Sequence, residues 1–195
     1  MQFTIKDKTF DSGRLNAFQQ LHVVRRLAPV TERLVALAGS AGDPEAFLGP
    51  LARTVGELPD ADVDYILNAC LDVTQIRQDT GGFARLRVNG VVMFPLDLTM
   101  LLGIAAHVLK DNLSGFFRRP PLGFEPCGEG CGIRWVTLPD GQDWLMRPVL
   151  RGLCRYEGLK DGTLSLEDVA LMNDALTVQE ENERRFMAAK EKERA

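Results

Sequence analysis

The feature that most constrains the fold is an apolar helical pattern over residues 98–116, LTMLLGIAAHVLKDNLSGF. Leucine, alanine and valine recur there at helical spacing for about five turns. We therefore expect this helix to form the core of a first domain. His107, Lys110 and Asp111 interrupt the apolar run, and the pattern falls short of the ~20 apolar residues that a membrane span requires.

Two short β-hairpins are predicted on the N-terminal side of this helix. The segment FTIKDKTF turns at Lys6–Asp7, with apolar residues on one side of its first arm. The segment FARLRVNGVVMF turns at Asn89–Gly90, a pair that readily adopts the positive backbone angles of a tight turn. Both segments predict strands in a chain that is otherwise helical.

Helical periodicity begins at Leu15 and is interrupted or restarted at Pro29. Each of the next helices has a proline or an acidic residue near its start, which suits the positive end of a helix. These further helices are predicted over residues 28–39, 42–58 and 59–73.

The chain divides at a segment rich in proline and glycine. We expect a helical N-terminal domain over residues 1–122, a linker or irregular segment over 123–142, and a small helical unit over 143–195. Helices are predicted in this last unit at 147–158 and from 165 onward, and the charged end of the second is expected to project into solvent or fray. The predicted fold class is mainly α with small β-hairpins (α+β).

Charge and composition exclude several classes of protein. The net charge of −4 argues against nucleic-acid binding. No basic start precedes an apolar run, so we expect no secretory signal, no membrane association, a cytoplasmic protein and reduced cysteines. Residues 41–80 hold eight acidic residues against two arginines. This asymmetry suits head-to-tail self-association or a basic partner, although a solvated helix face is the commoner cause.

The segment EGLKDGTLSLED, residues 157–168, resembles half of a calcium-binding loop. Its ligand positions are poor in oxygen, because Leu159 occupies one of them and the last lacks a bidentate glutamate. A structural interpretation uses the same residues better: Asp161–Gly162 makes a turn, and Ser165 and Asp168 form a capping box. We favour the cap.

Two other short motifs bear on catalysis or metal binding. Cys127 and Cys131 in CGEGC have a spacing that suits zinc, but no second pair follows them. Asp79 in DTG resembles the catalytic turn of aspartic proteases, but the polar residues before it favour an ordinary turn. We therefore predict no metal, no cofactor and no enzymatic activity, with a metal shared between subunits as the alternative at CGEGC.

Three arginines recur at helical spacing within the predicted helix 147–158, and they would form one basic ridge. A solvated face is the favoured interpretation, and a docking surface for an acidic partner or for another copy's acidic segment is the alternative. These arginines are Arg147, Arg151 and Arg155. His22 and His107 are interpreted as packed helical residues, not as ligands.

Residues 1–30, MQFTIKDKTFDSGRLNAFQQLHVVRRLAPV, and 108–117, VLKDNLSGFF, resemble the tail assembly chaperones of long-tailed bacteriophages and prophages. The resemblance rests on the opening hairpin, on GRLNAFQQ at the start of a helix followed by RRLAPV, and on the apolar helix that ends in DNLSGFF. It covers about the first 120 residues. Residues 144–185 resemble short uncharacterised proteins encoded in phage tail gene clusters.

The resemblance implies a non-catalytic chaperone in the host cytoplasm that binds the tape measure protein before the tail tube polymerises, and that is absent from the mature virion. In many such families ribosomal frameshifting adds a second domain that recruits tail tube subunits. This chain is then an extended form of that kind or a natural fusion. The alternative function is a minor tail or head–tail joining protein that remains in the virion.

A helical chaperone needs an apolar groove for its client. The candidate groove residues are Phe18, Leu21 and Val24, or Leu98, Leu101 and Leu102. We expect all six to belong mainly to the chain's own core, because a domain of this size needs such residues inside.

Overall fold

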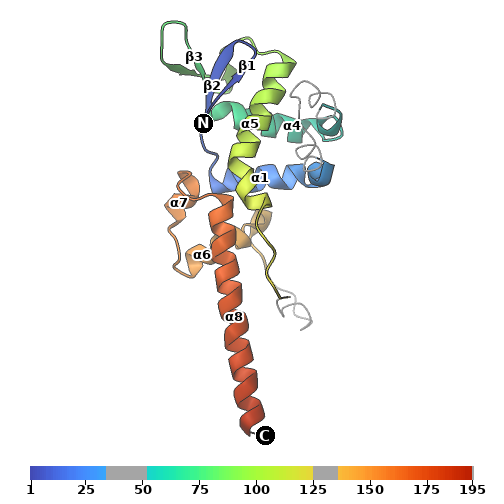
Figure 1. Ribbon diagram of the computed structural model, residues 1–195, viewed down its shortest axis with the longest axis vertical. Coiled ribbons are helices and arrows are strands. Elements are labelled where there is room, and N and C mark those ends of the chain that lie inside the picture. The colour runs from blue at the N-terminus through green and yellow to red at the C-terminus, as the bar shows by residue number, and fades with distance from the viewer. Residues whose placement is uncertain (34–51, 125–135, 195) are drawn as a thin grey trace.

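A computed structural model of the protein describes residues 1–33, 52–124 and 136–194 (Figure 1). This part of the chain is mainly helical and contains a small antiparallel sheet and a two-stranded ribbon, so the predicted fold class is confirmed. The sheet and most helices gather in one body, from which a long helix extends (Figure 1). The helices predicted at 28–39 and 42–58 lie partly outside the described residues. None of the described helices is long and apolar enough to cross a membrane.

Four antiparallel strands form the sheet in the order β1-β2-β3-β4. The first two make the predicted hairpin, and Lys6 in its turn has a positive φ of 54°. Phe3 pairs with Phe10, and Phe10 pairs with Ile76, so three core side chains lie in a row on one face. The strands are β1 (Gln2–Ile5), β2 (Lys8–Ser12), β3 (Thr74–Arg77) and β4 (Phe83–Arg85).

The predicted turn at Asn89–Gly90 is confirmed, with φ of 50° and 83° at the two residues. It joins the ribbon strands β5 (Arg87–Val88) and β6 (Val91–Val92). These arms are shorter than predicted, because Phe83–Arg85 pairs with β3 in the sheet instead of extending the ribbon.

Side-chain caps determine where two of the main helices begin. Asn16 and Gln19 form a capping box at the first helix, and Asp97 accepts a hydrogen bond of 2.9 Å from the Met100 amide. The first helix ends just before Pro29, as predicted. The helical elements are α1 (Ala17–Leu27), η1 (Ala28–Val30), α4 (Asp60–Asp72), α5 (Leu98–Phe117), η2 (Pro139–Gly141), α6 (Asp143–Leu150), α7 (Tyr156–Lys160) and α8 (Leu166–Arg194).

Helix α5 is the centre of the main core, as predicted. Ile104 and Val108 are fully buried, and the helix packs against α4, β1 and α8. Gly103 allows β1 to approach, because a Cβ there would lie 2.7 Å from the Cδ1 atom of Ile5. Sheet, α1, α4 and α5 thus share one apolar interior.

A second, smaller core joins α1 to the C-terminal unit. Its fully buried members come from α1, α6, α7 and α8: Ala17, Leu145, Leu159, Leu166 and Val169. Helix α1 therefore contributes one face to each core.

Candidate binding surface

The predicted groove residues on α1 are covered by the chain's own C-terminal unit. Phe18, Leu21 and Val24 are half-buried and pack against the second core. The ring of Phe18 meets the ring of Tyr156 edge-on, with 5.9 Å between the ring centroids. The expectation that these three residues serve the protein's own core is confirmed, and this face of α1 is not an open groove.

The three predicted residues on α5 differ in exposure. Leu102 is buried and Leu101 packs against the main core, whereas the side chain of Leu98 is 66% exposed. The expectation of a core position is therefore wrong for Leu98. It lies in the first turn of α5, where the helix has only begun to enter the body.

Leu102 also lines an apolar pocket of about 50 Å³ between α1, α4, α5 and residues 55–58. A pocket without polar groups offers water no hydrogen bonds, so it favours an apolar side chain. Its lining residues are Leu27, Val55, Leu58, Val63, Ile66, Leu67, Leu102, Ala105, Ala106 and Leu109.

The ribbon β5–β6 presents four apolar side chains to solvent. Val88 and Val92 are each 42% exposed, Met93 is 56% exposed and Val91 is 61% exposed. We call these four residues the hairpin patch. A run of apolar side chains that the protein leaves in water is typical of an interaction surface.

The hairpin patch is held firmly on the body. Arg87 in β5 donates a hydrogen bond of 2.7 Å to the carboxylate of Asp72, at the end of α4. The Met93 amide donates a hydrogen bond of 2.9 Å to the carbonyl of the buried Leu86. The sequence identified this turn but not its exposed valines; the signal was the run VVM after the turn, where a polar residue would be expected on the solvent side.

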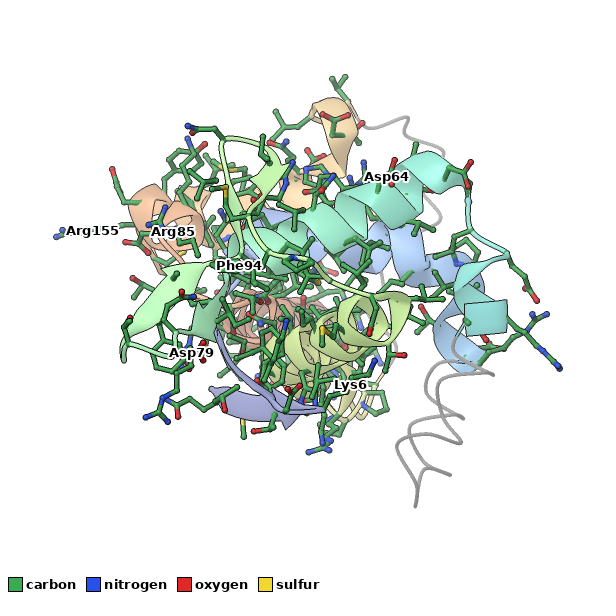
Figure 2. All side chains as sticks on the ribbon, turned by 90° about the horizontal axis from the view of Figure 1, so that it is seen from above. Lys6, Asp64, Asp79, Arg85, Phe94 and Arg155 are labelled. Carbon is green, nitrogen blue, oxygen red and sulfur yellow. The ribbon has the colours of Figure 1, made fainter. Side chains whose placement is uncertain are left out.

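The predicted arginine ridge is wrong, because residues 147–158 do not form one helix. Helix α6 ends at Leu150, and Gly152 has a left-handed φ of 74° that turns the chain. Arg147 and Arg151 each donate a hydrogen bond of 2.9 Å to Glu180 in α8. Arg155 precedes α7 and points away from the body (Figure 2).

The segment 157–168 holds the end of α7, then the turn and the helix cap that the sequence favoured. The amide of Thr163 donates a hydrogen bond of 2.8 Å to Asp161, and Gly162 has a φ of 81°. The amide of Ser165 donates to Asp168 over 2.8 Å, and the amide of Asp168 donates back to Ser165 Oγ over 3.2 Å. All these polar groups are used by the turn and by the start of α8.

The remaining candidates are structural where they are described. Asp79 lies in the outer turn between β3 and β4 (Figure 2), and the amide of Gly81 donates a hydrogen bond of 3.0 Å to the carbonyl of Gln78. Cys127 and Cys131 lie outside the described residues. Within the described ranges, no group of three or more histidine, cysteine, aspartate or glutamate side chains is arranged to hold a metal.

Both histidines contact aromatic rings. His107 stacks on Phe3 with ring centroids 4.3 Å apart, and His22 lies 6.1 Å from the ring of Tyr65. Burial lowers the pKa of each imidazole, and nearby arginines lower the pKa of His22 further. The interpretation as packed helical residues fits these contacts.

Two family models match the chain. The model described as phage tail assembly chaperone protein, TAC, matches residues 6–125, which is more than half of the chain. A model for a family of unknown function (DUF6889) matches residues 154–193, which include α7 and nearly all of α8. No curated protein and no solved structure matches. The hairpin patch and the apolar pocket both lie within residues 6–125.

Proposed function

Because the chain belongs to the phage tail assembly chaperone family, we propose that it binds an apolar helical segment of the tape measure protein and keeps that segment soluble until the tail tube forms. The family assignment gives a role in tail assembly and implies a non-enzymatic protein. The identity of the client and the surface that binds it are the proposed part.

The physical need for such a protein lies in the client. A long helical protein that will be enclosed by a tube exposes apolar side chains before the tube surrounds it, and such surfaces aggregate in water. A chaperone can cover them with an apolar surface of its own, with anchors that enter recesses on the partner.

The hairpin patch is the observation that supports this proposal most directly. It lies in the span that matches the chaperone family, and its four apolar side chains remain in solvent although Arg87 and Leu86 fix the ribbon on the body. The groove face of α1, by contrast, is already occupied by the C-terminal unit. The hairpin patch is therefore the surface on which a client can bind. The pocket beside Leu102 offers a recess for one of the client's apolar side chains.

Co-expression with the tape measure protein of the same phage tests the proposal. We expect the wild-type chain to hold the client in the soluble fraction and to co-purify with it. The double variant Val91→Asp, Met93→Asp should lose the complex, because two charges would have to be buried against apolar client residues. Leu150→Asp is the matched control, since Leu150 is 80% exposed but belongs to α6.

Two outcomes would overturn this proposal. One is a client that stays insoluble with the wild-type chain; the other is a complex that survives the double variant, or that Leu150→Asp disrupts as strongly as the double variant does. Circular dichroism of each variant confirms that the fold is intact.

The proposed place of action is the host cytoplasm, before the virion is complete. Mass spectrometry of purified virions should then find this chain absent or far below one copy per tail. Abundant copies in mature particles would instead support the alternative, a minor tail or head–tail joining protein.

A further inference from the structure

Helix α8 carries an apolar stripe on the side opposite to its packed face. The packed face includes Leu166, Val169 and Leu176, all buried. The stripe follows spacings of three and four residues, which keep its members on one side of a helix. Its apolar members, all exposed, are Leu171, Ala175, Val178, Phe186 and Ala189, and the exposed, polar Asn182 lies among them on the same side.

No described part of the chain covers this stripe. Leu171 and Phe186 are each 59% exposed, and α8 runs away from the body beyond α6 (Figure 1). At ~1.5 Å of rise per residue, the stripe from Leu171 to Ala189 is about 27 Å long. That length suits one further helix laid along it.

The charges beside the stripe change sign along the helix. Glu167 and Asp174 lie on one flank in the first half, and Arg185 and Lys192 lie on the same flank in the second half. Asp174 already pairs with Arg119, and Arg185 donates a hydrogen bond of 2.6 Å to Glu181. The guanidinium of Arg185 also lies 5.7 Å from the ring centroid of Phe124, and its side chain remains 61% exposed.

We propose that α8 pairs with α8 of a second copy of this chain, in antiparallel orientation. A twofold axis beside position 180 places Leu171 next to Ala189 of the second copy and Val178 next to Asn182 of the second copy. The same axis places Asp174 opposite Arg185 of the second copy. Apolar burial and charge complementarity then agree on one register.

A parallel pair of α8 helices would match the charges on their flanks less well. It would bring the flank that carries Arg185 against the opposite flank, where Lys190 stands at the corresponding level. Arg185 would then meet Lys190 as well as Glu183 on that flank, and the acidic residues of the first half would lack basic partners. The antiparallel pair is therefore the arrangement that the charges favour.

Sedimentation equilibrium of the full chain over a concentration series tests this inference independently of any client. We expect a monomer–dimer equilibrium. The double variant Val178→Glu, Phe186→Glu should raise the dimer dissociation constant at least about tenfold, because charges replace apolar groups at the centre of the interface. Met187→Glu is the matched control, since Met187 is equally exposed but lies off the stripe.

A charge-exchange series tests the orientation. Arg185→Glu with Lys192→Glu should weaken the dimer, and adding Asp174→Lys and Glu167→Lys to the same chain should restore it, because an antiparallel pair regains opposite charges at both levels. A wild-type chain that is monomeric throughout, or a dimer that both stripe substitutions leave unchanged, would overturn the proposal. Failure of the exchange to restore association would overturn the antiparallel arrangement.

Discussion

Helices α5 and α8 are the two longest described helices, and they use their apolar residues differently. Buried side chains occur along α5 from Met100 to Leu113, because the sheet, α4 and α8 surround it. Buried side chains on α8 stop at Glu181, and the residues beyond it are almost all exposed. An apolar residue between Met100 and Leu113 of α5 that is buried therefore stabilises the fold, whereas one on the outer face of α8 is free to bind another molecule.

The largest expected effect comes from emptying the core around α5. Ile104→Ala should lower the free energy of unfolding by about 2–5 kcal/mol, because the fully buried side chain leaves a cavity. Met187→Ala on the outer half of α8 should change it by less than ~0.5 kcal/mol. Urea unfolding followed by circular dichroism measures both, and similar losses would contradict the contrast between the two helices.

The next effect concerns the link between α1 and α8. Gln20 is buried; its Nε2 donates a hydrogen bond of 2.7 Å to the Leu15 carbonyl and its Oε1 accepts one of 2.8 Å from the Leu166 amide. Gln20→Ala leaves both backbone groups unpaired, at a cost of about 2–4 kcal/mol. Hydrogen exchange should accelerate first at the start of α8. Gln179→Ala, at an exposed position, is the control and should exchange like the wild type.

A smaller effect separates the arginines of the C-terminal unit. Arg147 donates hydrogen bonds to Thr177, over 3.0 Å, and to Glu180, and its side chain is mostly covered. Arg147→Ala should therefore destabilise the protein by about 1–2 kcal/mol. Arg155→Ala should change thermal stability little, because Arg155 lies on the surface. Equal effects in thermal unfolding would contradict the expectation that only Arg147 makes stabilising contacts.

The smallest effect depends on pH. Hydrogen bonds from Arg184 and Arg185 lower the pKa of Glu181 to about 2. A lowered pKa in the folded state means that this carboxylate stabilises α8 fully above its ordinary pKa and progressively less as pH falls towards 2. Helix content in circular dichroism should therefore decline slightly more in that interval for the wild type than for Glu181→Gln. An identical decline in both proteins would show that the contacts contribute nothing.

The elements that sequence predicted best depend on local signals. The turns at Lys6–Asp7 and Asn89–Gly90, the cap at Ser165 and the helix over 98–116 each follow from neighbouring residues. Strand β3 was missed because Ile76 is its only apolar buried residue, beside the buried but polar Thr74, and because its existence depends on pairing with β2 far earlier in the chain. Pairing across such distances leaves little trace in a single short segment.

The candidate sites were harder to predict than the fold. An amphipathic pattern shows that Phe18 and Leu21 need an apolar partner, but it cannot tell whether that partner belongs to the same chain. The helical spacing of the three arginines continues through Gly152 in the sequence. The backbone turns at Gly152, however, so the arginines do not share one helix. In the sequence the hairpin patch shows only as successive apolar residues, without the alternation of apolar and polar residues that a half-buried strand has. Its exposure follows from how the ribbon packs on α4.

The bond between Gln20 and Leu166 joins residues that are 146 positions apart. During translation at about 5–20 residues per second, the first partner leaves the ribosome roughly 7–30 s before the second. Over that interval the apolar face of α1 is not yet covered by the C-terminal unit. The nascent chaperone therefore exposes an apolar surface of its own for that time. Slowing the synthesis of its last third should increase its aggregation.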